Sequence, residues 1–252
     1  MNQKYRAPTV RKAFQILRLL ARRESGLRLS EIARQLQIGK STVHGLVAAL
    51  EQEDAVERDP DSKRFSLGLG LLGLGRAVDA RMDLKQVAHP FMEDLRAKTQ
   101  ESVFLGSRSF QHTTIVDIVE STRDLKITSP IGTRLPLLAG ATGKVFLAAL
   151  PAEQAGAWLD AKQLRRYTEN SITDAEKYLQ ELERVRREGY ALDDEEYIPG
   201  VRAVASAISG PRQPMSAIWV VGFTPSMSAD KTRMIAQETK RTAAAIGQCL
   251  ME

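Results

Sequence analysis

Two short helical segments separated by a tight turn constrain the fold of this chain more than any other feature of its sequence. Apolar residues recur at helical spacing over residues 30–36, Ile38-Gly39 interrupts the pattern, and helical spacing resumes from about Lys40 to Asp54. Two short helices joined by a glycine-containing turn form a helix-turn-helix unit. The sequence therefore predicts this unit in the first quarter of the chain.

The segments on either side of this unit extend it to a winged domain. A helical pattern over residues 9–20 precedes it, and two short alternating segments, 56–58 and 63–67, follow it around a Pro/Asp/Ser turn at 59–62. The small and polar side chains of the second helix suit the major groove of DNA, which is roughly 12 Å wide. Basic side chains on the hairpin would reach phosphates. The predicted DNA-binding residues are Lys40, Ser41, Thr42, His44, Arg58, Lys63 and Arg64.

Positive charge is concentrated in the same region. Residues 1–70 contain 13 Lys and Arg against 8 Asp and Glu, whereas the remaining 182 residues contain 23 of each. The entire formal net charge of +5 therefore lies in the first quarter of the chain. A basic module joined to a neutral one is expected where only one part of a chain meets phosphate. A solvated basic face would show the same excess, so the charge supports DNA binding only together with the order of the elements.

At this point the sequence resembles a known family. The segments L-S-E-I-A-R-Q-L (29–36), K-S-T-V-H-G-L (40–46) and R-F-S-L-G (64–68) are similar to the DNA-binding domain of the IclR family of transcriptional regulators. Gly45 stands where an arginine is common in that family, and Phe65 stands where a tyrosine is common. The resemblance implies binding to operator DNA, but the family's operator preference does not transfer because that arginine is missing.

A glycine-rich segment follows the predicted hairpin. Residues 68–73 match the G-x-G-x-x-G fingerprint of dinucleotide-binding folds, which requires a strand before it and an acid at the end of a second strand about twenty residues later. Here the match follows a hairpin, and Glu93 and Asp94 lie in a helical pattern. We therefore expect no nicotinamide cofactor. The segment instead predicts a linker helix over residues 69–83, whose leucines are free to pack against a second copy of the chain.

In the remainder of the chain, the spacing of apolar residues alternates between the pattern of a helix and the pattern of a strand. Adjacent predicted strands joined by short turns favour an antiparallel sheet flanked by helices. The predicted fold class is α+β: a winged helix-turn-helix over residues 7–68, the linker helix, and an α/β sandwich domain with an antiparallel sheet over residues 84–252. The predicted strands are 103–105, 113–119, 201–209 and 216–223, and the predicted helices are 87–98, 140–150, 173–189 and 228–250.

Residues that carry enzyme chemistry are sparse. The three histidines and the single cysteine lie far apart in the sequence, and no metal-ligand spacing or nucleophile elbow is present. Residues 141–145 resemble the end of a phosphate-binding loop but lack its first glycine and the Ser/Thr that binds magnesium. The acidic run at 193–196 either binds a cation or forms a solvated turn, which is the usual role of such runs. We expect no cofactor, no metal and no enzymatic activity.

The resemblance to the IclR family extends over this second domain. The motifs G-x-x-x-P-L (132–137), G-K-V-x-L-A (143–148), G-Y-A-x-D-x-E-E (189–196) and G-V-R (200–202) are similar in order and spacing to the family's effector-binding domain. The resemblance implies a ligand between the sheet and the loop that leads to the Gly-Lys helix. The implied effector-binding residues are Ile127, Leu135, Ala141, Thr142, Asp193, Val201, Ala203, Val220 and Gly222.

Elementary chemistry is consistent with this implied pocket. Ala141 and Thr142 lie at a predicted helix start, where unpaired N–H groups favour an anion, and Asp193 would receive a hydroxyl or cationic group. Members of the family that bind small polar acids often have Cys or Ser at the positions of Ala203, Val220 and Gly222, so we expect a less polar effector, such as an aromatic or short aliphatic carboxylate. These residues would equally well complete a hydrophobic core.

Together these features predict a cytoplasmic, soluble transcription regulator without a membrane segment, controlled by a small-molecule effector. A homodimer or a dimer of dimers would match a pseudo-palindromic operator. One alternative is a small-molecule enzyme on the C-terminal domain, with the N-terminal domain used for assembly. Another is a DNA-binding scaffold whose C-terminal domain only assembles oligomers.

Overall fold

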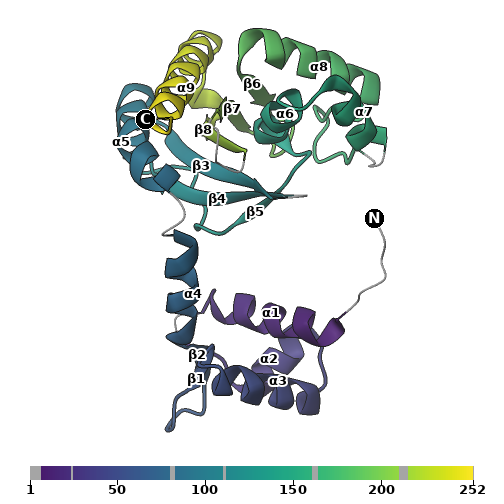
Figure 1. The fold of residues 1–252 in the computed structure, drawn as a ribbon, viewed down its shortest axis with the longest axis vertical. Helices are drawn as coiled ribbons and strands as arrows, with labels where there is room; N and C mark the ends of the chain where they lie inside the picture. The colour runs from purple at the N-terminus through teal and green to yellow at the C-terminus, as the bar shows by residue number, and fades with distance from the viewer. Residues whose placement is uncertain are drawn as a thin grey trace. The chain divides into compact units, whose positions relative to one another are not determined.

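The computed structural model describes residues 7–23, 25–79, 83–109, 112–160, 164–209 and 215–251. The chain divides into two compact units between residues 82 and 83 (Figure 1), and each has a hydrophobic core of its own. The predicted linker helix begins as α4 (Gly70–Asp79), and its predicted residues 80–82 lie outside the described residues.

The first unit is the predicted winged helix-turn-helix. Gln37 ends the first helix of the motif with a left-handed backbone (φ 55°), which reverses the chain before the second helix begins. Buried apolar side chains from all three helices and the hairpin form one core, with Ile16, Ile32 and Val43 fully buried. The elements are α1 (Pro8–Leu20), α2 (Leu29–Leu36), α3 (Lys40–Gln52), β1 (Val56–Arg58) and β2 (Phe65–Leu67).

The hairpin is anchored to the loop before α2. Leu27 and Phe65 exchange both backbone hydrogen bonds, with N···O distances of 2.9 and 2.8 Å. Gly26 precedes this bridge with φ +64°, and a Cβ there would lie 2.7 Å from the carbonyl oxygen of Phe65. Only glycine fits such a close approach in that conformation. The hairpin is therefore held against the helical core rather than projecting freely.

The second unit is built on one antiparallel sheet of six strands in the order β5-β4-β3-β8-β7-β6. This confirms the predicted α+β class with an antiparallel sheet. Two short edge strands, β5 and β6, were not predicted from the sequence. The strands are β3 (Ser102–Ser109), β4 (His112–Val119), β5 (Arg134–Pro136), β6 (Ala191–Asp194), β7 (Val201–Ile208) and β8 (Ser216–Phe223).

Helices cover both faces of this sheet. Ile218 and Val220 of β8 pack in one core with α5 and α9, whereas Ala217, Trp219 and Val221 of the same strand pack in a second core with α6. Side chains alternate between the two faces of a strand, so neighbouring residues of β8 belong to different cores. The helices are α5 (Asp83–Thr99), α6 (Gly140–Ala148), α7 (Ala152–Asp160), α8 (Ala175–Glu188), the 3₁₀ turn η1 (Thr224–Ser226) and α9 (Ala229–Cys249).

The acidic run differs from the solvated turn that the sequence favours. Asp193 lies in β6 and is only 5 % exposed. Among the described residues, no group of three or more His, Cys, Asp or Glu side chains is placed to hold a metal ion. Within the same residues, no helix has both the length and the apolar character needed to cross a bilayer.

Candidate functional site

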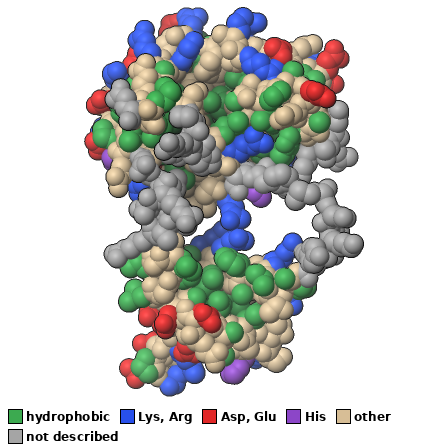
Figure 2. Space-filling view, viewed as in Figure 1, with side chains coloured by type: hydrophobic (Ala, Val, Ile, Leu, Met, Phe, Trp, Pro, Cys, Tyr) green, Lys and Arg blue, Asp and Glu red, His purple; other side chains and the backbone are tan. Residues whose placement is uncertain are grey.

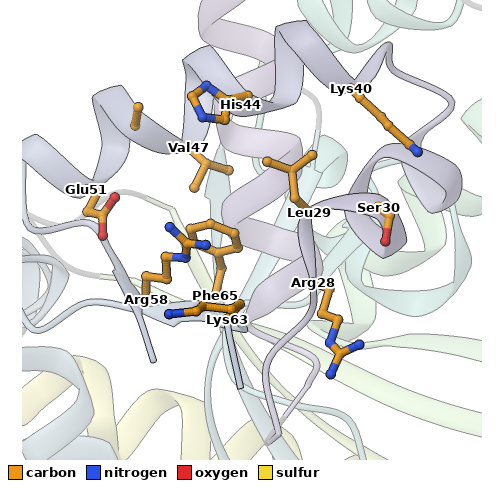
Figure 3. Close-up of a pocket in the computed structure, with 11 residues that line it drawn as sticks. Arg28, Leu29, Ser30, Lys40, His44, Val47, Glu51, Arg58, Lys63 and Phe65 are labelled. Carbon is orange, nitrogen blue, oxygen red and sulfur yellow. The ribbon is translucent and has the colours of Figure 1, made fainter. Parts of the chain in front are cut away.

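A basic groove lies between α3 and the hairpin of the first unit (Figure 3). Its volume is about 390 Å³, and apolar side chains of Leu29, Val47 and Phe65 form part of its lining. The guanidinium of Arg58 lies 5.5 Å from the ring centroid of Phe65. This cation–π interaction holds the cation beside the groove that both residues line. The polar residues that line the groove are Arg28, Ser30, Lys40, His44, Glu51, Arg58 and Lys63.

Four of the seven predicted DNA-binding residues therefore line one surface. Ser41 and Thr42 are exposed on the first turn of α3 but do not line the groove. Gly39 precedes that turn and provides no side-chain cap, so the first N–H groups of α3 lack a side-chain partner. Arg28 was missed by the sequence analysis, although a basic residue immediately before α2 was a visible indication.

Arg64 is placed differently from the prediction. Its Nη1 donates to the carbonyl oxygen of Gly26 at 2.9 Å and lies 3.5 Å from Oε2 of Glu31. Glu31 also accepts a hydrogen bond of 2.7 Å from the backbone N–H of Arg28, and this bond is the largest cause of the lowered pKa of Glu31. Arg64 therefore braces the hairpin against the start of α2, whereas its neighbour Lys63 faces the groove.

A second cavity lies between the sheet of the second unit and α6. It has a volume of about 230 Å³, and its walls are mostly apolar. The rings of Phe104 and Trp219 are stacked 5.5 Å apart with an interplanar angle of 9° and form part of the wall. Seven of the nine implied effector-binding residues line this cavity: Ile127, Leu135, Ala141, Thr142, Asp193, Val201 and Ala203.

The other two, Val220 and Gly222, lie on the opposite face of the sheet. Val220 is fully buried in the core with α5 and α9, and a Cβ on Gly222 would lie 2.7 Å from Oε2 of Glu101. Their neighbours Trp219 and Val221 line the cavity instead, because side chains alternate along β8. The inference of an apolar ligand therefore loses its support from these two positions, and it now depends on Ala203 and the aromatic wall.

The polar end of the cavity is the start of α6. Gly140 begins the helix with φ +64°, and Ala139 before it makes no side-chain cap, so the first N–H groups are not satisfied by a cap. A Cβ on Gly143 would lie 1.8 Å from the carbonyl oxygen of Leu137. This glycine therefore allows the helix to pack directly on the loop that leads into it.

Asp193 lies at the same end of the cavity. Its Oδ1 accepts hydrogen bonds from the backbone N–H groups of Glu196 and Tyr197 at 2.7 and 3.3 Å. Its Oδ2 is next to Gly140, since a Cβ on that glycine would lie 2.5 Å away. Burial raises the pKa of Asp193 from 3.8 to about 6, although these backbone hydrogen bonds act to lower it.

The lysine of the Gly-Lys motif does not face the cavity. Lys144 is 1 % exposed, and its Nζ donates to Oε1 of Glu196 at 2.6 Å, to Oε1 of Glu181 at 3.3 Å and to the carbonyl oxygen of Leu192 at 2.7 Å. The ammonium group thus joins α6 to α8 and to the loop after β6. This buried ion-pair network agrees with the rejection of a phosphate-binding role for residues 141–145.

Comparison with known proteins decides the family. The model of the bacterial transcriptional regulator IclR C-terminal domain matches residues 76–248, and the IclR helix-turn-helix domain matches residues 9–60. The chain belongs to the IclR family. The HTH-type transcriptional regulator KipR of Bacillus subtilis is 32% identical over 241 residues, which cover 95% of this chain and 96% of KipR.

Solved structures of IclR regulators share the fold. An IclR transcriptional regulator from Alicyclobacillus acidocaldarius has a TM-score of 0.79 at 28% identity, and the match covers 97% of this chain and 99% of that one. An IclR homolog from Microbacterium hydrocarbonoxydans, complexed with 4-hydroxybenzoate, also has a TM-score of 0.79, at 19% identity, with 96% and 98% covered. At that identity the second match supports the fold alone.

Membership of the IclR family establishes the general function. The chain is a transcription regulator with a DNA-binding helix-turn-helix domain and an effector-binding domain. IclR regulators bind operator DNA and small-molecule effectors. The alternative of an enzyme with an assembly domain has no support among these relatives, which are regulators of transcription.

Proposed function

We propose that the cavity beside α6 binds a small, largely apolar carboxylate, and that its occupancy changes the affinity of the winged domain for operator DNA. One observation carries this proposal: the cavity combines an aromatic wall with a helix start that has no side-chain cap. A carboxylate at Ala141 and Thr142 would accept hydrogen bonds from backbone N–H groups and interact favourably with the helix dipole. The apolar body of the ligand would lie against Phe104 and Trp219.

The size of the cavity supports a single-ring or short aliphatic acid. Pockets that bury drug-sized ligands span roughly 300–1,000 Å³, and this cavity has about 230 Å³. The Microbacterium hydrocarbonoxydans homolog was solved with 4-hydroxybenzoate, a ligand of this class. Aromatic monocarboxylates are therefore the first compounds to test.

A thermal-shift screen tests the effector proposal. Benzoate, 4-hydroxybenzoate and short aliphatic carboxylates should raise the Tm, whereas benzamide, of matched shape without the charge, should not. At a ligand concentration roughly a hundred times Kd the stabilisation is about 2.7 kcal/mol. Ala203→Leu should abolish the shift by filling the cavity, while Ala207→Leu on the same strand, outside the cavity lining, should retain it. If no carboxylate stabilises the protein, the cavity belongs to a scaffold rather than to a sensor.

The groove of the first unit is the proposed DNA-binding surface. α3 would enter the major groove, with Ser41 and Thr42 on its exposed first turn near base edges. The cations that line the groove, Arg28, Lys40, Arg58 and Lys63, would contact phosphates, together with His44. Arg64 is assigned to holding the hairpin. Operator DNA is found in the bacterial cytoplasm, and the proposal places the protein there.

Exposed apolar side chains on the first unit support a homo-oligomer. Val10 and Phe14 of α1 are 56% and 53% exposed, and Leu72 and Leu74 of α4 are 51% and 68% exposed. Figure 2 shows hydrophobic side chains gathered over α1. Exposed apolar patches of this kind mark association sites. A second copy of the chain would cover it, and the resulting two-fold would place two recognition helices on a pseudo-palindromic operator.

A further inference from the structure

We propose that Asp193 determines ligand specificity. Its carboxyl group becomes protonated and neutral when it binds the carboxylate of the effector, so that effector binding takes up one proton. The inference rests on the function proposed for the cavity and concerns the chemistry of its polar end. No covalent bond forms or breaks. The proton comes from solvent, resides on a carboxyl oxygen of Asp193 and is shared with the ligand in an O–H···O hydrogen bond.

The geometry brings the two carboxyl groups together. An acid that uses the N–H groups at the start of α6 lies beside Gly140, and Oδ2 of Asp193 already lies beside the same glycine. Oδ1 is occupied by the backbone N–H groups of Glu196 and Tyr197. Oδ2 is therefore the oxygen that faces an incoming ligand. When both groups are ionised, two acceptors of like charge meet at this point, and when Asp193 is protonated it becomes a donor.

The surrounding charges do not neutralise Asp193. Among the residues that the structure describes, Asp193 forms no ion pair, whereas Lys144, the cation that acts on it, is already paired with Glu196 and Glu181. Arg184 on α8 is likewise paired with Glu181 and Glu188. The phenols of Tyr178 and Tyr197, which also interact with Asp193, have raised pKa values because of burial and remain neutral.

This charge distribution favours the proton on Asp193 when an anion arrives. Each of the two cations in this region, Lys144 and Arg184, is already paired with two glutamates, and an ionised ligand adds a further negative charge beside Asp193. Removing the charge of Asp193 by protonation costs little near neutral pH, because burial already raises its pKa to about 6. An ionised Asp193 would instead select a hydroxyl or cationic ligand, which gives the opposite dependence on pH.

Isothermal titration calorimetry on the full-length protein tests the proposal. Benzoate and 4-hydroxybenzoate are titrated at pH 6, 7 and 8 in two buffers with different ionisation enthalpies, with benzyl alcohol and benzylamine as neutral and cationic probes. Carboxylate affinity should fall about tenfold per pH unit above the pKa of Asp193. The buffer dependence should report an uptake of roughly one proton at pH 8.

Two variants assign the proton to Asp193. Asp193→Asn keeps an oxygen for the backbone N–H groups and places an amide donor at Oδ2, so it should bind carboxylates without pH dependence or proton uptake. Asp194→Asn, on the same strand but exposed and paired with Arg202, should behave like the wild type.

The outcomes separate this inference from the function on which it rests. The role of Asp193 is overturned if the wild type binds carboxylates with an affinity that does not depend on pH. It is also overturned if Asp193→Asn keeps the fall of affinity with pH or no longer binds carboxylates. Neither result contradicts the proposal that the cavity is a sensor. Preference for benzylamine that grows with pH overturns the role of Asp193 as well. Absence of binding by any carboxylate overturns the proposed effector class and this inference with it. The wild-type buffer comparison needs no variant, so it tests the predicted proton uptake even if a variant does not fold.

Discussion

Replacing Asp193 by Asn should make the ligand-free protein more stable at neutral and alkaline pH, an unusual result for a buried polar residue. Asp193 is 5 % exposed and has its Oδ1 hydrogen-bonded to two backbone N–H groups. The amide oxygen of Asn can accept the same two bonds, so the substitution removes the buried charge while it keeps the local structure. The change in stability therefore reports the cost of ionising this carboxyl group in the fold.

The magnitude and its sign follow from the pKa. Burial raises the pKa of Asp193 from 3.8 to about 6, and this difference corresponds to a free energy on the order of 3 kcal/mol. Because the folded pKa is the higher one, the folded state binds the proton more tightly. The wild type keeps its full stability below pH 4 and loses this amount as the pH rises to and beyond 6. The variant does not titrate at this position and avoids the loss.

Both tryptophans, Trp158 and Trp219, lie in the second unit, so their fluorescence reports the unfolding of that unit alone. Urea denaturation of the wild type and of Asp193→Asn should be followed at pH 4, 5, 6, 7 and 8. The stability difference should be near zero at pH 4, grow between pH 4 and 6, and level off above pH 7. Asp194→Asn should show no such growth, because Asp194 is exposed.

Two results would refute the reasoning. If the difference in stability between the wild type and Asp193→Asn stays constant over this pH range, burial does not raise the pKa of Asp193. A variant that is less stable than the wild type at pH 8 would mean that the hydrogen bonds of the ionised carboxylate outweigh its desolvation.

Three further predictions concern the first unit. Lys63→Ala should weaken binding to all DNA sequences and reduce the slope of log K against log salt by about 1, measured by fluorescence anisotropy. Arg64→Ala should instead lower the stability of the winged domain by about 1 kcal/mol through the lost bond to Gly26, and equal salt slopes for both variants would contradict this division. Phe14→Glu, on the exposed apolar face of α1, should shift the protein towards monomer in analytical ultracentrifugation without changing its circular dichroism. An unchanged mass would place the interface elsewhere.

Much of the fold could be predicted because its elements carry local patterns. The helix-turn-helix depends on 3.6-residue periodicity interrupted by Ile38-Gly39, and the structure has α3 beginning at the predicted Lys40. The strand β8 and the helix α9 also begin at or next to their predicted residues, 216 and 228. Each of these signals lies within a short segment, and it does not depend on what packs against that segment.

The short edge strands could not be predicted for the opposite reason. β6 extends over only four residues, Ala191–Asp194, and two of them are acidic, so it lacks the apolar alternation that predicts a strand. Its conformation comes from pairing with β7, which follows it in the sequence after a loop. The burial of Asp193 follows from that pairing and from the start of α6 above it.

What the sequence determined by itself was the winged DNA-binding domain, the class of the second domain and the segments that form its cavity. What the tertiary structure alone decided was which side chains face which partner. Seven of the eight residues of β8 are buried, on both faces of the sheet, so no alternation of polar and apolar residues distinguishes Trp219 and Val221 from Val220 and Gly222. Arg64 and Lys63 likewise differ only in where the folded hairpin directs them. Orientation of this kind depends on contacts between segments distant in sequence, and those contacts exist only in the folded chain.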